Sequence, residues 1–309
     1  MARLRYVKPI SRSLIADHMD RFLVTGASGQ IGSRVATQLT SALADRGKAP
    51  PRLLLRRSEC LPMPPGAECV WGDFDDLDSM ARAFEGVRSV FLYTPAHTDP
   101  GLLTLAAQKG VRHVVLLSSA SVARVAPGTN PIAERHRRAE QAVIDAGLEW
   151  TFLRPDILAS NCLSWSNSII QEGLVRVPYP ESRRNPLHED DVAAVACAAL
   201  LRDELRSSTL LLTGPSVLTI RQQVMALAEV TGMPLRCVSI SEAEALQAMS
   251  RSQPQLSTEA ATRLLAYQRK MVAIEPETTQ AVLRVMGRPA RTFAHWAQDH
   301  VADFQPPRK

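Results

Sequence analysis

The chain has few of the features that mark special protein classes. Its cysteines are odd in number, scattered and never in a Cys-x-x-Cys pair, which argues against a disulfide framework and a zinc site. We expect buried free thiols at Cys60, Cys69, Cys162, Cys197 and Cys237. No apolar run approaches the roughly 20 residues that cross a bilayer, and residues 1–20 lack the apolar core of a signal peptide. These absences predict a cytoplasmic protein with no membrane partner and no metal.

The charge is basic but dispersed. With 36 Lys and Arg against 31 Asp and Glu, the 309 residues carry a net charge of +5. The arginines form short groups such as Arg56-Arg57, Arg137-Arg138 and Arg183-Arg184, and no basic stripe is interleaved with aromatic residues, which make up only 5% of the chain. This pattern predicts no nucleic-acid partner. It suits a ligand that carries several phosphates.

Short apolar runs alternate with helical patterns through the first half of the chain. The runs predict strands near residues 22–24, 52–57, 70–71, 87–93, 111–117 and 150–153. Helices are expected after the first strand and over about 77–84, 102–109, 132–146 and 190–201, with a last strand at 209–212. This alternation is typical of a parallel sheet covered on both faces, and it predicts an α/β, doubly wound Rossmann fold.

The pattern loosens after Pro155 and becomes mostly helical from Thr219. We therefore expect a Rossmann domain over residues 21–155, with 186–214 returning to its sheet. Residues 156–185 and 215–309 are expected to form a smaller, mainly helical substrate-binding subdomain. Residues 1–20 form an N-terminal extension, either a docking arm or a dispensable segment.

The most informative motif is a glycine-rich turn directly after the first strand. Gly26, Gly29 and Gly32 are spaced G-x-x-G-x-x-G, and Ser28, Gln30 and Ile31 complete the loop. Gly26 would allow the sharp turn, Gly29 the approach of a pyrophosphate to the backbone, and Gly32 the close packing of helix on strand. The motif predicts a dinucleotide site; the alternative is a turn that serves packing only.

Two further positions predict which cofactor binds. The second strand ends in Arg56 and Arg57, where a carboxylate would favour NAD, so the pair favours the 2′-phosphate of NADP(H). Alternatively, both are solvated charges at a strand end. Asp73 is expected to accept a hydrogen bond from the adenine amino group, with Phe74 beside the ring, unless Asp73 serves only as a turn or helix-cap residue.

Other cofactor contacts are expected at the carboxyl ends of the later strands, because ligands of open parallel sheets bind there. Tyr93 either faces the cofactor or packs. The remaining expected contacts are Thr94, Pro95, Ser118 and Pro155.

Several motifs resemble the NmrA-like branch of the atypical short-chain dehydrogenases. They are Val24-Thr25-Gly26-Ala27-Ser28-Gly29-Gln30-Ile31-Gly32, Gly72-Asp73-Phe74-Asp75-Asp76, His136-Arg137-Arg138-Ala139-Glu140, Gly147-Leu148-Glu149-Trp150-Thr151-Phe152-Leu153-Arg154-Pro155 and Leu212-Thr213-Gly214-Pro215. The resemblance implies a Rossmann domain that binds NADP(H) and a helical C-terminal domain that closes over the nicotinamide. It further implies quinone or ketone reduction or, in some members, cofactor sensing without chemistry.

The chain departs from this family at the catalytic helix. Active short-chain dehydrogenases have a tyrosine four residues before a lysine there; this chain has Ile132 and His136 at those positions. Ala120 falls where the catalytic serine is expected, although Ser119 or Ser121 would serve after a shift of one residue. His136 would hydrogen-bond the nicotinamide ribose or protonate the product near neutral pH. Alternatively it is an exposed surface histidine.

The other histidines and the C-terminal aromatic residues are weaker candidates. His113 is expected to be structural, and the acidic residues after His188 are expected to begin a helix. His97 is likewise a weak candidate for a functional residue. His295 and Trp296 either line the pocket or, for the tryptophan, pack in a core with Phe293 and Phe304.

Without the tyrosine as a proton donor, the substrate must itself stabilise the negative charge that develops when hydride is added. The sequence therefore predicts an NADPH-dependent oxidoreductase that transfers hydride to a conjugated carbonyl, either a quinone or a polycyclic aromatic ketone of the kind seen in aromatic polyketide tailoring. The alternative is a non-catalytic regulatory protein that senses NADP(H); imine or alkene reduction and isomerisation are further possibilities. We expect a monomer or a homodimer.

Overall fold

The computed structural model describes residues 21–56, 63–93, 100–252 and 256–306. The chain divides into two compact units. The described residues up to Leu153 form the first unit together with Ala196–Thr209, and Arg154–Val195 forms the second with the described residues from Leu210 onward. Each unit is described below by itself.

The first unit is built on a seven-stranded sheet in the order β3-β2-β1-β4-β5-β6-β9. Its strands are β1 (Arg21–Val24), β2 (Arg52–Leu55), β3 (Glu68–Trp71), β4 (Val87–Tyr93), β5 (His113–Leu117), β6 (Glu149–Pro155) and β9 (Ser208–Leu212). The pairs from β3 through β6 are parallel. This order confirms the doubly wound fold, with the reversal of strand order beside β1.

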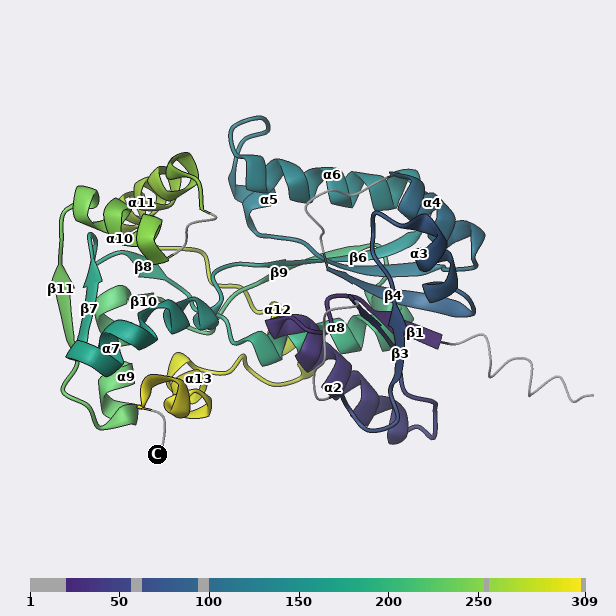
Figure 1. Ribbon diagram of the computed structural model, residues 1–309, viewed down its shortest axis with the longest axis horizontal. Coiled ribbons are helices and arrows are strands. Elements are labelled where there is room, and N and C mark those ends of the chain that lie inside the picture. Colours follow the sequence, from purple (N-terminus) through teal and green to yellow (C-terminus); the bar gives the residue numbers. More distant parts are fainter. Residues whose placement is uncertain (1–20, 57–62, 94–99, 253–255, 307–309) are drawn as a thin grey trace, which may run out of the picture. The chain divides into compact units, whose positions relative to one another are not determined.

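Helices cover both faces of this sheet (Figure 1). On one face lie α3 (Leu77–Ala83), α4 (Pro100–Gln108) and α6 (Pro131–Asp145). On the other lie α2 (Gln30–Ala44) and the last residues of α8 (Glu189–Leu201), where the Cys197 thiol lies 3.7 Å from the Val35 carbonyl oxygen. A short helix, α5 (Ser121–Arg124), precedes α6.

Helix α2 forms because its apolar residues recur every three or four positions. Val35, Leu39 and Leu43 lie on one face, and none of the three is exposed to solvent. Strands β4 and β5 are apolar almost throughout because helices bury both faces of the sheet. The same burial accounts for the near-continuous apolar runs in the sequence.

The second unit contains more regular structure than the sequence predicts. The loose region up to Pro186 holds η1 (Ala159–Trp165), α7 (Ser166–Glu172), β7 (Leu174–Val177) and β8 (Arg183–Arg184). The predicted helical part also contains the short strands β10 (Leu218–Thr219) and β11 (Arg236–Ser239). These strands form two small sheets, β10-β8 and β11-β7. β8 and β10 have only two residues each, and β7 and β11 contain arginines, so none of the four forms a continuous apolar run that the sequence would reveal.

The helices of the second unit surround a separate core. They are α9 (Ile220–Thr231), α10 (Glu242–Ser252), α11 (Thr258–Ala273), α12 (Ala281–Met286), α13 (Phe293–Asp299) and η3 (Val301–Phe304). Trp296 stacks on Phe293 at 5.3 Å and meets Phe304 edge-on at 6.1 Å, and all three are buried. The prediction that these aromatic residues pack in a core is confirmed.

The prediction of buried thiols holds for two cysteines. Cys162 and Cys197 are buried and free, but Cys69 on the edge strand β3 is exposed, and Cys237 is half-buried. Cys60 lies outside the described residues. Among the described helices, none combines the length and the apolar character that a bilayer span requires.

Candidate functional site

The glycine-rich turn connects β1 to α2. Gly26 has a φ of +61°, a left-handed conformation that glycine adopts without strain. Its carbonyl oxygen accepts a hydrogen bond of 2.9 Å from the Gly29 amide, which closes the turn. The chain thereby reverses direction within three residues and enters the helix.

The start of α2 leaves room for an anion. Gly29, the N-cap residue, is exposed, no side chain caps the helix, and the first turn contains no acidic residue. A Cβ atom on Gly32 would lie 1.9 Å from the Gly26 carbonyl oxygen, so helix and turn touch through backbone alone. Uncapped amides at the N-terminus of a long helix fit the pyrophosphate of a dinucleotide.

Hydrogen bonds of Thr25 connect this turn to strand β4. The buried Thr25 donates from its backbone amide and from its hydroxyl to the Phe91 carbonyl oxygen, both at 3.0 Å. The Tyr93 amide donates to the same hydroxyl at 2.8 Å. Tyr93 is half exposed, and its Cβ would be 3.1 Å from a Cβ placed on Gly26. Tyr93 therefore borders the turn, and Thr94 and Pro95 lie outside the described residues.

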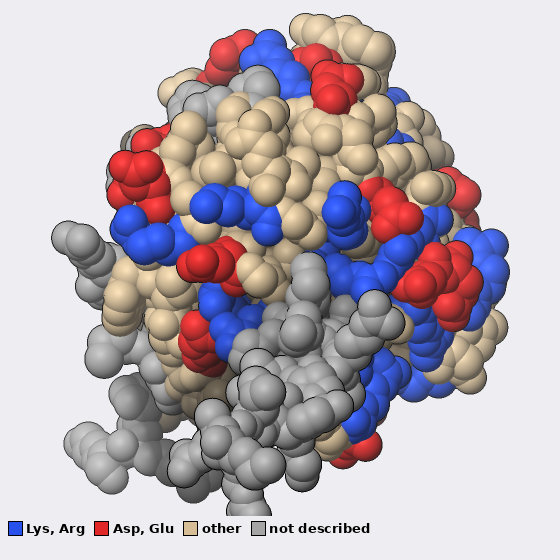
Figure 2. Space-filling view, turned by 90° about the vertical axis from the view of Figure 1, so that its right-hand side faces the viewer, with Lys and Arg blue, Asp and Glu red and all other residues tan. Residues whose placement is uncertain are grey.

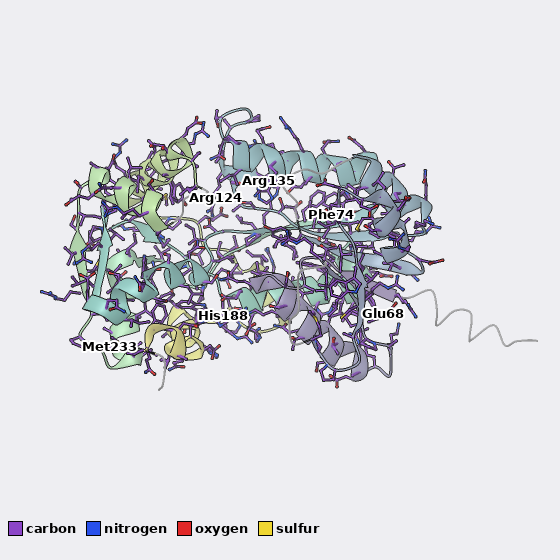
Figure 3. All side chains as sticks on the ribbon, viewed as in Figure 1. Glu68, Phe74, Arg124, Arg135, His188 and Met233 are labelled. Atoms are coloured by element: carbon purple, nitrogen blue, oxygen red, sulfur yellow. The ribbon has the colours of Figure 1, made fainter. Side chains whose placement is uncertain are left out.

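The ends of β2 and β3 carry the residues expected at the adenosine half. Arg56 is exposed directly after β2, and Arg57 lies outside the described residues. The Asp73 side chain accepts a hydrogen bond from the Asp75 amide at 3.1 Å, an Asx turn, as the alternative interpretation expects. Phe74 packs against the core of the first unit (Figure 3).

A buried carboxylate lies beside the end of β5. The Ser118 hydroxyl donates to Glu140 of α6 at 2.5 Å, and both side chains are almost fully buried. The sequence pattern alone indicates no role for Glu140. Its spacing of four residues from His136 on one helix was the available signal, because such residues share a face.

His136 lies on the inward face of α6. It is only 9% exposed, so the interpretation as an exposed surface histidine is wrong. Burial lowers its pKa to about 4, with the charge of Arg135 acting in the same direction and that of Glu140 against it. Its Nδ1 has no hydrogen-bond partner within the described part of the chain. A neutral imidazole with an unused ring nitrogen suits hydrogen bonding to a ribose better than proton donation at pH 7.

The other positions that were expected to be catalytic hold no tyrosine. Ile132 is 50% exposed in the first turn of α6. The Ser119 hydroxyl oxygen accepts hydrogen bonds from the Ser121 amide at 3.2 Å and the Ser121 hydroxyl at 2.9 Å. Ala120 between them is buried. The Ser119 hydroxyl oxygen therefore accepts two hydrogen bonds just before α5. Pro155, the last residue of β6, is buried.

Two other histidines have structural contacts. His113 is buried in β5, and its Nε2 lies 3.0 Å from the Thr151 hydroxyl, as expected of a structural residue. In the second unit, His188 (Figure 3) accepts at Nδ1 from the Asp190 amide at 3.1 Å, and its Nε2 lies 3.1 Å from an Asp299 oxygen. The acidic first turn of α8 that follows it is confirmed.

The burial of His113 and His136 predicts that the protein loses stability in weak acid. Burial lowers the pKa of each from 6.5 to about 4, so the folded state favours neutral rings. This stabilisation is present above pH 6.5 and is lost as the pH falls toward 4, by roughly 3 kcal/mol per residue. We expect urea unfolding to show this fall, and His113→Gln to reduce its slope. An unfolding free energy that is constant from pH 7 to 4 would contradict the prediction.

The surface charge is mixed, as the sequence predicts. On the face seen in Figure 2, Lys and Arg side chains are interspersed with Asp and Glu side chains over the described residues. Toward the lower right of that view several Lys and Arg side chains adjoin one another, with Asp and Glu side chains beside them. Charges of both signs therefore occur together on this face.

Comparisons with known proteins agree with this geometry. A family model described as NAD(P)H-binding matches residues 26–203. A (4-alkanoyl-5-oxo-2,5-dihydrofuran-3-yl)methyl phosphate reductase from Streptomyces griseus is 37% identical over 288 residues, covering 92% of this chain and 99% of that protein. An NAD(P)H azoreductase from Xenophilus azovorans is 31% identical over 299 residues, covering 91% and 98%.

A solved structure has the same fold. It is an NADPH-dependent quinone oxidoreductase from Escherichia coli in complex with NADPH, with a TM-score of 0.72 and 18% sequence identity. The similarity covers 90% of this chain and 99% of that protein.

Proposed function

Because this chain belongs to the NAD(P)H-binding family, we propose that it is an NADPH-dependent reductase of conjugated carbonyl compounds that works without a tyrosine as acid. The observation that carries the proposal is the pairing of an open dinucleotide turn with a catalytic helix that presents Ile132 and His136. The first feature binds a hydride carrier. The second leaves the substrate to stabilise its own charge.

The proposed roles of the residues follow from their geometry. The amides at the start of α2 bind the pyrophosphate, and the neutral His136 ring hydrogen-bonds the nicotinamide ribose. Bound NADPH supplies the hydride. The protein contributes position and orientation, which lower the barrier by making the reaction effectively unimolecular. Residues 21–155 with 186–214 bind the cofactor in this proposal, and 156–185 with 215–309 bind the substrate.

The relatives support a conjugated acceptor. The names of the two similar proteins and of the solved structure specify an alkanoyl-oxo-dihydrofuran, azo compounds and quinones, all of which delocalise added charge. A quinone or an aromatic ketone would do the same here. The dihydrofuran compound also carries a phosphate, and a cationic side chain at the binding site would favour a substrate of that kind.

The decisive experiment is a substrate panel. NADPH consumption is measured with quinones, alkanoyl-dihydrofuranones, aromatic hydroxyketones and aliphatic ketones, products are identified by mass spectrometry, and cofactor binding is measured in parallel. We expect turnover of conjugated acceptors only. Rapid reduction of simple aliphatic ketones would contradict the proposal, because these need a proton donor that the described site lacks.

The exposed Ile132 also supports a second candidate, a sensor of NADP(H) without chemistry. A sensor must bind the oxidised and reduced cofactors with different affinities, since only differential binding shifts a conformational equilibrium. Tight cofactor binding with no turnover across the panel would favour this function.

We expect Arg56 to contribute to the choice of NADPH. It stands at the carboxyl end of β2, where the 2′-phosphate of the cofactor would lie. Arg56→Gln should weaken NADPH binding by about 10- to 100-fold and leave NADH binding unchanged, because a charge-assisted hydrogen bond contributes about 1.5–3 kcal/mol. Arg57→Gln is the matched variant, and titration with both cofactors gives the dissociation constants. Equal losses for NADPH and NADH in Arg56→Gln would exclude the phosphate contact.

A further inference from the structure

Strand β8 of the second unit carries two adjacent arginines with different surroundings. Arg183 and Arg184 pair with Thr219 and Leu218 of β10, so their side chains leave opposite faces of the strand. The Nε of Arg184 is buried without a hydrogen-bond partner, and none of the described carboxylates forms an ion pair with this guanidinium. Arg184 itself is partly exposed, and its buried Nε is a donor without an acceptor among the described residues, which is costly.

The neighbours of Arg184 do not neutralise it. The buried Cys162 thiol is uncharged at neutral pH because burial raises its pKa to about 12. Desolvation lowers the pKa of Arg184 itself; among the groups that act against this, Asp156 has a smaller effect than Cys162 and Tyr267. Among the described residues no ion pair joins Asp156 to Arg184, and the guanidinium keeps its positive charge.

Two buried side-chain oxygens near Arg184 in the sequence have no hydrogen-bond partner among the described residues. The Ser182 hydroxyl is 1% exposed and has no partner among the described residues. It precedes Arg184 by two positions, which places both side chains on the same side of an extended segment. Asn185 is fully buried; its amide nitrogen donates to the Glu277 carbonyl oxygen at 2.6 Å, while its Oδ1 has no partner within the described chain. Such groups are rare unless a water or a ligand completes them.

We propose that Arg184, assisted by the Ser182 hydroxyl, binds a phosphate monoester group of the substrate. This inference rests on the proposed reductase function and specifies its substrate class. A guanidinium can donate two parallel hydrogen bonds to phosphate oxygens, and a serine hydroxyl can donate a third. The phosphate supplies a negative charge in direct contact with Arg184, and it thereby selects phosphorylated substrates.

The test compares an alkanoyl-oxo-dihydrofuranylmethyl phosphate with the corresponding alcohol. We expect the wild-type chain to prefer the phosphate, and Arg184→Gln to lose about 10- to 100-fold of this preference through KM, with the kcat for the alcohol retained. Arg183→Gln is the matched control, since it removes the same charge from the adjacent position. It should retain the preference. Equal preference in wild type and Arg184→Gln would overturn the proposal.

Two further measurements keep the outcomes separate. If Arg184→Gln fails to fold, Arg184→Lys replaces it; the lysine keeps the charge but loses the planar donor pair, and the preference should fall several-fold. A carboxylate analogue reduced as well as the phosphate would overturn the assignment of phosphate.

The inference can also be tested without turnover. Inorganic phosphate, added to protein saturated with NADPH, should raise the melting temperature of wild type and Arg183→Gln but not of Arg184→Gln. This result with no reduction of any panel compound would count against the proposed function while supporting the phosphate site. Reduction of panel compounds, with no effect of phosphate on substrate preference or on melting temperature, would support the proposed function and count against the phosphate site.

Discussion

Replacing Gly32 with alanine is expected to abolish measurable NADPH binding and to lower the free energy of unfolding by about 3 kcal/mol. The new Cβ would lie 1.9 Å from the carbonyl oxygen and 2.5 Å from the carbonyl carbon of Gly26. Both atoms belong to the backbone, so no flexible side chain can move aside. The first turn of α2 must separate from the glycine turn, and its amides then no longer converge on one point.

Gly29→Ala provides the control for this prediction. A Cβ at Gly29 meets only the Gly26 carbonyl oxygen, at 3.3 Å, and Gly29 is exposed. Its stability should stay within about 1 kcal/mol of wild type, whereas NADPH affinity falls because the methyl group occupies the side that faces the pyrophosphate. Cofactor titration and thermal unfolding of both variants provide the comparison. A Gly32→Ala protein with wild-type melting and affinity would refute the close-packed turn.

The second large effect is expected at Asp191, which joins α8 to the chain that precedes α13. Its side chain is fully buried. One carboxylate oxygen accepts from the guanidinium groups of Arg288 at 2.8 Å and Arg291 at 2.6 Å, and the other accepts from the Arg291 amide at 2.6 Å. Asp191→Asn removes the negative charge and replaces one acceptor by a donor. We expect a loss of about 3–5 kcal/mol in the free energy of unfolding, since both guanidinium groups lose their buried counter-charge.

Glu181 supplies the matched comparison. It accepts a 2.6 Å hydrogen bond from Arg221, but both side chains are about half exposed. Glu181→Gln should therefore cost less than about 1 kcal/mol, because water screens an exposed pair. Urea unfolding of the two variants measures the difference directly. Similar losses for both would show that burial does not control the strength of these pairs.

The sequence predicted the first unit well because its signals are local. The glycine spacing, the amphipathic residues of α2 and the apolar strands each act within a few neighbouring residues, and each was found where expected. The pattern failed in the second unit, where β8 and β10 have only two residues and β7 and β11 contain arginines in place of a continuous apolar run. Such strands are stabilised by pairing with strands that are distant in the sequence, as β11 pairs with β7. Their own residues show no clear periodicity.

Helix α6 shows the same division. Sequence spacing predicted that Ile132 and His136 lie on this helix, where the family's tyrosine and lysine are expected. It left open whether His136 is exposed, because several charged neighbours surround it in the chain. Only the packing of α6 on the sheet decided that His136 and Glu140 face inward, and burial then set the neutral state of the imidazole.

By itself, the sequence determined the doubly wound architecture and the glycine-rich turn, since both depend on residue identity at short spacing. The tertiary structure alone decided three other features: the uncapped start of α2 with its backbone contact at Gly32, the burial of Asp191 between two arginines, and the buried Nε of Arg184 that has no acceptor among the described residues. These features depend on which distant segments meet and on how far water is excluded from them. Both are set by the packing of the whole chain, and a local pattern does not contain them.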